Sequence, residues 1–132
     1  GAHIIMCAGD GEGTSLWVGV YIIDIADVSN PTEIGFITTP GTHVGEGVQA
    51  ISVNTQSFKG DLLVVNGESC GTIPNRIGGF SLYDVTDPSN PVTLVENFGD
   101  IRTVGSVTRA NQIHSAFAWQ QGKKAYVVIV DD

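Results

Sequence analysis

The stretch "DVTDPSNPVTLV", residues 84–95, repeats the pattern of "DIADVSNPTEIG", residues 24–35. The two leading aspartates are 60 positions apart, and the longer segments "GVYIIDIADVSNPTEIGFI" and "GFSLYDVTDPSNPVTLVEN" align at that spacing. Each copy has a β-branched and aromatic run, a turn-forming cluster and a second apolar run, which is typical of two strands joined by a hairpin connection. The repeat therefore predicts one supersecondary unit that occurs at least twice.

The residues of the repeated cluster are those that a turn needs. We expect Asp87 to accept a hydrogen bond from the backbone two residues on, and Pro88 to fix φ at the first central position of a type I turn. Asn90 tolerates the left-handed region, and Pro91, which lacks an N–H donor, can begin an edge strand. In the first copy Val28 replaces the first proline, and the turn positions that remain are Asp27, Ser29, Asn30 and Pro31.

A second self-match has a spacing of 65 positions. It aligns "GEGVQAISV" (45–53) with "ANQIHSAFA" (110–118), and "LLVVN" (62–66) with "VVIVD" (127–131). Together the two matches predict a repeating unit of four strands. We expect strands near His3–Ala8, Val18–Ile25, Glu33–Thr38, Gly47–Asn54, Asp61–Asn66, Gly79–Val85, Val92–Asn97, Ile113–Gln120 and Ala125–Asp131.

Four-stranded antiparallel units that repeat along a chain are typical of β-propeller blades. The sequence therefore predicts one all-β segment, residues 1–132, with part of a first blade (3–38), a whole second blade (47–98) and part of a third (113–132). About two and a half blades form an incomplete ring. The alternative is a nine-stranded β-sandwich, which could close within 132 residues but leaves the double repeat unexplained.

Composition excludes some classes of partner. The formal net charge is −8, with 14 acidic against 6 basic residues, so no basic cluster is present to bind nucleic acid phosphates. No apolar run approaches the roughly 20 residues that cross a bilayer, so we expect no membrane insertion of this segment. The chain opens with "GAHIIMCAGD" and closes with "AYVVIVDD". Both ends are strand-like, and we expect a piece of a longer or processed protein.

The two cysteines leave two interpretations open. Cys7 and Cys70 can form one disulfide or remain as buried thiols, and their spacing fits no metal-ligand pair. A bridge would favour a secreted or periplasmic setting.

At this level the chain resembles the LVIVD repeat of bacterial and archaeal propeller proteins. The residues that carry the resemblance are "YIID" or "SLYD" followed by "IADVSNP" or "VTDPSNP", with "GEGVQAISV", "GDLLVVNGESCG" and "NQIHSAFAW". The resemblance implies a propeller fold and an extracellular, periplasmic or cell-surface location. It carries no catalytic residues over, because the biochemical role of the family is poorly defined. The literal "VIVD" at Val128–Asp131 falls on a second strand rather than a third.

One set of polar residues is the candidate site. At the spacing of 65, Glu46 aligns with Asn111 and Gln49 with His114, so they enter equivalent first strands at the same end of adjacent blades. Innermost strands line the channel of a propeller, where polar groups from several blades converge. The set predicts a ligand site, and the alternative is hydrogen bonding between blades that fixes a buried turn. The candidate residues are His43, Glu46, Asn111 and His114.

No dinucleotide, phosphate-loop or nucleophile-elbow motif is present, so we predict no catalytic residues and no organic cofactor. Candidate ligands for a divalent metal are Glu46, His114 and Asp131. The leading hypothesis is a binding or scaffold module for an unidentified protein or small molecule. The alternatives are a hydrolase or lyase with a His/Glu site at the channel mouth, and a structural subunit that assembles with copies of itself or with the rest of its own propeller.

Overall fold

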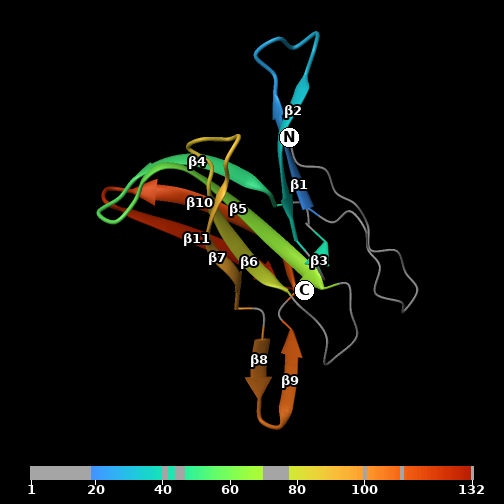
Figure 1. Ribbon diagram of the computed structural model, residues 1–132. Coiled ribbons are helices and arrows are strands. Elements are labelled where there is room, and N and C mark those ends of the chain that lie inside the picture. The colour runs from blue at the N-terminus through green and yellow to red at the C-terminus, as the bar shows by residue number, and fades with distance from the viewer. Residues whose placement is uncertain are drawn as a thin grey trace, which may run out of the picture.

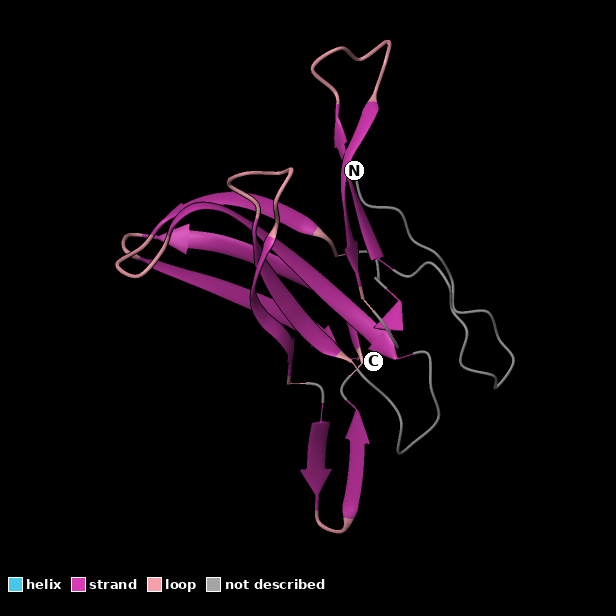
Figure 2. Ribbon diagram, viewed as in Figure 1, coloured by secondary structure: helices cyan, strands magenta, loops and turns pink. Residues whose placement is uncertain are grey.

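The computed structural model describes residues 19–39, 42–43, 47–69, 78–99, 101–110 and 112–131. All elements in this part are β-strands, which confirms the predicted all-β class (Figure 1; Figure 2). No described helix is long and apolar enough to cross a membrane. The strands are β1 (Gly19–Asp24), β2 (Thr32–Thr38), β3 (Thr42–His43), β4 (Gln49–Asn54), β5 (Lys59–Ser69), β6 (Gly79–Asp84), β7 (Val92–Phe98), β8 (Ile101–Val104), β9 (Val107–Ala110), β10 (Ile113–Gln121) and β11 (Lys124–Asp131).

The central sheet is the four-stranded unit that the repeat predicts. β4, β5, β6 and β7 pair with their neighbours in chain order, and every pairing is antiparallel. β3 joins the same edge of β5 as β4, beyond the point where β4 begins, so that Thr42 lies opposite Ser69. The hairpin of β1 and β2 and the hairpin of β10 and β11 form separate two-stranded sheets. None of the described sheets closes into a barrel.

The repeated turn has two hydrogen bonds that are the same in both copies, and the second copy adds one from Asn90 Nδ2 to Asp87 Oδ2 at 2.8 Å. In each, the backbone N–H of the serine donates to the aspartate Oδ1, at 3.0 Å for Asp27 and 3.1 Å for Asp87. In each, the asparagine N–H donates to the carbonyl of the same aspartate at 3.0 Å. The next strand begins directly after Pro31 in the first copy and after Pro91 in the second, at Thr32 and at Val92. The predicted hydrogen bond from the backbone to the aspartate is therefore present at both places, whereas Asn90 does not adopt the left-handed conformation.

An aspartate also ends the strand before each turn. Oδ1 of Asp24 accepts from Ala26 N at 2.8 Å, and Oδ1 of Asp84 accepts from Thr86 N at 2.9 Å. The hydrogen bonds from the hydroxyl and backbone N–H of Thr86 lower the pKa of Asp84, because they stabilise its charged form. The two aspartate side chains in each copy thus accept hydrogen bonds from two backbone N–H groups that a turn would otherwise leave to water.

The central sheet lies between the two hairpins, because β5 packs against the β1–β2 hairpin with one face and against β10 with the other. On one face, Leu63 and Val65 pack with Val20 and Ile37 of the β1–β2 hairpin. On the other, Leu62 and Val64 pack with residues of β4 and β10, namely Val53, Ala116 and Ala118. Because side chains alternate along a strand, the apolar run 62–65 supplies both faces in turn. Full burial of each such side chain stabilises the fold by roughly 1.5–3 kcal/mol.

The close approach of β10 depends on a glycine. A Cβ at Gly47 would lie 2.3 Å from the backbone nitrogen of Ala116 and 2.8 Å from Cα of Ser115. Backbone atoms cannot move aside as a side-chain tip can, so glycine is required at this crossing. Two glutamine side chains then join the same two strands. Gln49 exchanges hydrogen bonds with the backbone of Ala118, and Gln120 does so with the backbone of Asn54.

The structure corrects the second self-match by one residue. Asn54 pairs with Lys59 across the β4–β5 turn, and Gln120 pairs with Ala125 across the β10–β11 turn, so equivalent positions are 66 apart and not 65. The cause is an irregularity in β10 between Ile113 and Ser115, which adds one residue to that strand. Side chains alternate between the two faces of a strand. The extra residue therefore places on the outer face the residues that the sequence match assigned to the inner face, and the reverse.

Three short strands lie outside the predicted set of strands. β8 and β9 form a hairpin through Gly105, whose φ is +63°, and β3 is a two-residue bridge. The run "IRTVGSVTRA" has β-branched residues on both sides of a Gly-Ser pair, which is a hairpin pattern that the repeat-based prediction passed over. Figure 1 shows this hairpin projecting from the end of the central sheet.

Candidate functional site

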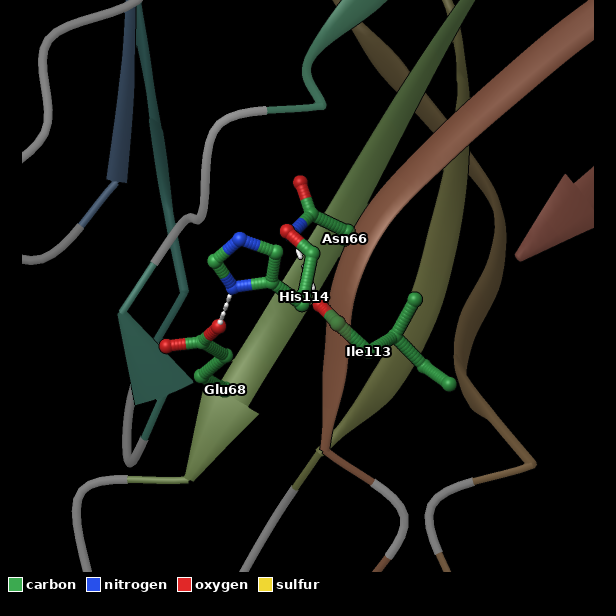
Figure 3. Close-up of polar contacts among 4 residues, drawn as sticks. All are labelled: Asn66, Glu68, Ile113 and His114. Atoms are coloured by element: carbon green, nitrogen blue, oxygen red, sulfur yellow. Dashed lines mark hydrogen bonds and ion pairs between the residues drawn. The ribbon is translucent and has the colours of Figure 1, made fainter. Parts of the chain in front are cut away.

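The candidate site lies where the end of β5 meets the start of β10. Val64, Asn66 and Glu68 share one face of β5, because they alternate along the strand. β10 crosses this face. Its residue Ala116 packs near Val64, and its first residues lie beside the polar ones. The apolar interface between two layers therefore becomes polar at this end (Figure 3).

His114 and Glu68 form the polar contact that faces solvent. Nδ1 of His114 lies 2.5 Å from Oε1 of Glu68, and the side chains are 44% and 16% exposed. A carboxylate in this position orients the imidazole ring. When Nδ1 carries the proton, Nε2 is the acceptor nitrogen of the neutral ring. The geometry thus offers a held imidazole at the surface.

Asn66 anchors the strand that carries this histidine. It is fully buried, and its Nδ2 donates to the carbonyl oxygens of Ile113 and His114, at 2.7 Å each (Figure 3). These carbonyls lie at the irregularity of β10, where regular pairing with β11 is interrupted. The Asn66 amide therefore donates to backbone carbonyl oxygens at the point where the β10–β11 pairing is irregular. Within the described part of the chain, Oδ1 of Asn66 is buried and accepts no hydrogen bond.

The structure brings together some of the residues predicted for the site. The backbone of His43, on β3, lies opposite that of Glu68. His114 contacts Glu68 directly, and Asp131 is exposed and opposite Ile113 at the end of β11. The other predicted residues lie outside the described residues, and these are Glu46, Asn111, Cys7 and Cys70. Among the described residues, no three of the types His, Cys, Asp and Glu are grouped closely enough to hold a metal ion.

Sequence reasoning missed Glu68, the carboxylate that contacts His114. The two residues are 46 positions apart, and no motif joins them. The available signal was the polar sequence "NGES" that follows the apolar run of β5, which marks a strand that leaves the core. The partner on β10 could be identified only once the stacking of the layers was known.

A groove between β1 and the central sheet was also not predicted. Its volume is about 570 Å³, and its apolar lining includes Val20, Ile22 and Leu63. Polar groups enter it from Asp61 and Thr86, whose atoms are joined by a hydrogen bond of 2.9 Å from Asp61 N to the threonine hydroxyl. An apolar groove with a few placed polar groups is the usual form of a small-molecule site.

Comparison with known proteins adds no assignment to these features. A scan against protein-family models, a search of curated proteins and a search of solved structures each found no match.

Proposed function

We propose that this chain is an extracytoplasmic, LVIVD-type propeller segment that serves as a binding or scaffold module. The observation that carries the proposal is the stack of three repeat-related layers, in which two copies of the same turn connect corresponding strands. A four-stranded antiparallel unit that buries both faces against its neighbours is how propeller blades pack. The turn sequences on which the family resemblance rests occupy the hairpin position that this architecture requires.

The ligand of such a module would meet the polar end of the layer interface. His114 and Glu68 contact each other there, so the ligand would meet a histidine–carboxylate pair. Asn66 fixes the backbone of β10 behind them, so the site sits on strands rather than on a loop. We propose a protein or small-molecule ligand that carries a hydrogen-bond donor or a coordinated metal, since both suit an imidazole beside a carboxylate.

Binding at this end can be mapped by amide NMR. Purified protein is first analysed for tightly held metal and then titrated with Zn²⁺ and with a library of small polar molecules. We expect shifts to concentrate at the end of β5 and the start of β10, and to disappear in His114→Ala. Glu33→Gln, which alters an exposed carboxylate on β2, is the matched control. Shifts that persist unchanged in His114→Ala would contradict a site at this place.

The extracytoplasmic location has separate tests. We expect the intact gene product to carry an export signal. We also expect thiol titration of denatured protein, prepared without reductant, to find Cys7 and Cys70 joined. Two free thiols in that material, or an intact product that stays in the cytoplasm, would contradict this part of the proposal.

A second candidate function is a hydrolase or lyase that uses the same residues. It is favoured by the contact of 2.5 Å between His114 Nδ1 and Glu68 Oε1, which is the base-and-orienter arrangement of general acid–base catalysis. His114 would transfer the proton, and Glu68 would hold the ring. Assays with ester, glycoside and lyase substrates test the idea. Turnover should be lost in His114→Ala and lowered in Glu68→Gln, and activity that survives His114→Ala would rule it out.

A further inference from the structure

The β8–β9 hairpin projects from the end of the central sheet, between the strands of that sheet and β10 in the chain (Figure 1). β8 and β9 pair with each other and with no other described strand. The side chains of Thr103 and Ser106 are exposed, and a Cβ placed on Gly105 would meet no atom within 4 Å. A two-stranded hairpin is only marginally stable by itself. Burial in the described core therefore does not explain the sequence of this element.

The turn determines which residues of the hairpin lie opposite each other. A two-residue loop that begins with Gly105 joins the strands, and this glycine has a φ of +63°. Glycine with a positive φ at the first central position is typical of a type II′ turn, which sets the register of the strands on either side. In this register Arg102 lies opposite Arg109, and Val104 lies opposite Val107. Because positions alternate along a strand, these four residues share one face of the hairpin.

Two arginines at opposed positions are unfavourable for the hairpin itself. Like charges directly opposite each other destabilise an antiparallel pair of strands. The chain has 14 acidic and 6 basic residues, yet residues 101–110 contain two of the basic residues and no acidic one. A sequence that breaks a local rule of stability commonly does so at a functional site. The register therefore indicates a surface for an anionic partner.

We propose that the face of the β8–β9 hairpin that contains Arg102 and Arg109 binds an acidic segment of another protein. Each guanidinium group can form paired hydrogen bonds with one carboxylate. Opposed positions are about 5 Å apart and alternate residues of an extended peptide are about 7 Å apart, so two long arginine side chains suit two successive carboxylates on one side of such a peptide. The valine positions on the same face favour a peptide over a sulfated polysaccharide, because a peptide can carry apolar side chains beside its acidic ones.

This surface is separate from the His114–Glu68 pair, so the inference goes beyond the proposed function. The hairpin lies between two repeat-related units, in the connection that leads from β7 to β10. Strands that extend the propeller at either end would pair with other elements. The surface is thus compatible with a larger ring.

The first test is binding of an acidic peptide to the full chain. Fluorescence anisotropy at physiological ionic strength measures the affinity for a labelled peptide of alternating glutamate and valine. Arg102→Gln combined with Arg109→Gln should weaken binding roughly tenfold or more, because two sets of charge-assisted hydrogen bonds are lost. Lysine at both positions should weaken it roughly threefold, since the charge remains and the paired hydrogen bonds do not.

The matched control removes the same charge from another turn. Lys123→Gln combined with Lys124→Gln alters the β10–β11 turn and should change the affinity less than roughly twofold, because salt screens distant charges. An equal loss in this control and in the double arginine variant would overturn the proposal, because binding would then follow net charge alone.

A further variant separates the arrangement of the arginines from their charge. Gly105→Val places a β-branched residue at a positive φ, so it disturbs the turn while both arginines remain. The affinity for the peptide should fall roughly threefold or more, because the register that sets the arginines opposite each other is lost. Circular dichroism and urea unfolding check that every variant keeps the central fold. Unchanged affinity in Gly105→Val would contradict the role of the hairpin.

Other ligands and the His114 site give distinguishable results. Equal binding of a peptide with glutamine in place of glutamate, or no binding at the highest soluble concentration, overturns the proposal. So does a sulfated oligosaccharide or inorganic phosphate that binds at the arginines when the peptide does not. His114→Ala should leave peptide affinity unchanged. Peptide binding that is lost in His114→Ala and kept in the double arginine variant would place the peptide at the other site, whereas failure of ligand binding at His114 with intact peptide binding counts against the proposed function alone.

Discussion

Nδ1 of His114 lies 2.5 Å from Oε1 of Glu68, so a residue of the β10–β11 hairpin contacts a residue of the central sheet that is 46 positions away in sequence. The pair forms at the point where the interface between the layers changes from apolar to polar. A contact of this kind joins the architecture to the candidate site, because it exists only when the layers stack.

A double-mutant cycle measures this contact. Glu68→Gln and His114→Ala should show a coupling free energy of about 0.2–1 kcal/mol in urea unfolding, since the histidine is 44% exposed and solvent screens the pair. The coupling should be larger at a pH where the imidazole is protonated. A value indistinguishable from zero at every pH would show that the two side chains do not interact in solution.

Replacement by aspartate should destabilise the protein far more at the buried Asn66 than at the exposed Asn54. Asn66→Asp replaces two donated hydrogen bonds with a carboxylate that faces the carbonyl oxygens of Ile113 and His114, at a fully buried position. We expect a loss of about 3–5 kcal/mol in the free energy of unfolding, measured with urea. The control is Asn54→Asp, where the side chain is exposed and Oδ1 already accepts from Lys123 Nζ at 3.1 Å. It should change stability by less than about 1 kcal/mol.

Gly47→Ala tests the crossing of β10 over the start of β4. The added methyl group would meet the backbone of Ala116 at 2.3 Å, so the layers must separate locally. We expect destabilisation of about 1–3 kcal/mol and increased amide exchange in β10. Gly35→Ala is the comparison, because its nearest contact is the carbonyl oxygen of Pro88 at 3.1 Å. Equal effects of the two substitutions would argue against the close crossing.

The buried Tyr83 hydroxyl should cause the protein to lose stability at high pH. Burial raises the pKa of its hydroxyl, the hydrogen bond with Ser81 partly opposes this, and the charge of Glu96 adds to the rise. The neutral form is favoured in the folded protein, so its contribution is complete below the unfolded pKa near 10 and is lost as pH rises through the folded value. Tyr83→Phe should lack this component of the pH dependence in urea unfolding. An identical dependence in the variant would contradict the assignment.

The strands of the central sheet could be predicted from the sequence because the residues that determine them are close together along the chain. The turn residues at Asp27 and Asp87 determine where hairpins form, and apolar runs of four to six residues mark the strands between them. The hydrogen bonds that these aspartates accept are the ones expected from the residue types. The unpredicted β8–β9 hairpin has the same local pattern, but it belongs to neither repeat and was passed over for that reason.

The site was less predictable because it depends on relations between layers. The match at 65 positions aligned similar apolar letters, and no property of those letters reports the extra residue between Ile113 and Ser115. His114 was identified as a candidate, but Glu68, the carboxylate that contacts it, was not. Packing determines which strands of neighbouring layers lie against each other, and their distance in the sequence does not. Residue types alone therefore identify contacts between layers poorly.

The inner position of β5 has one more consequence. Residues 62–65, "LLVV", offer nearly the same shapes to both faces, so a slip of β5 by one residue would bury almost the same apolar surface. A slip would, however, turn the amide of Asn66 away from the two carbonyls that it now holds. One polar side chain at the end of the strand thus selects a single alignment from two that hydrophobic burial alone would leave nearly equal in energy.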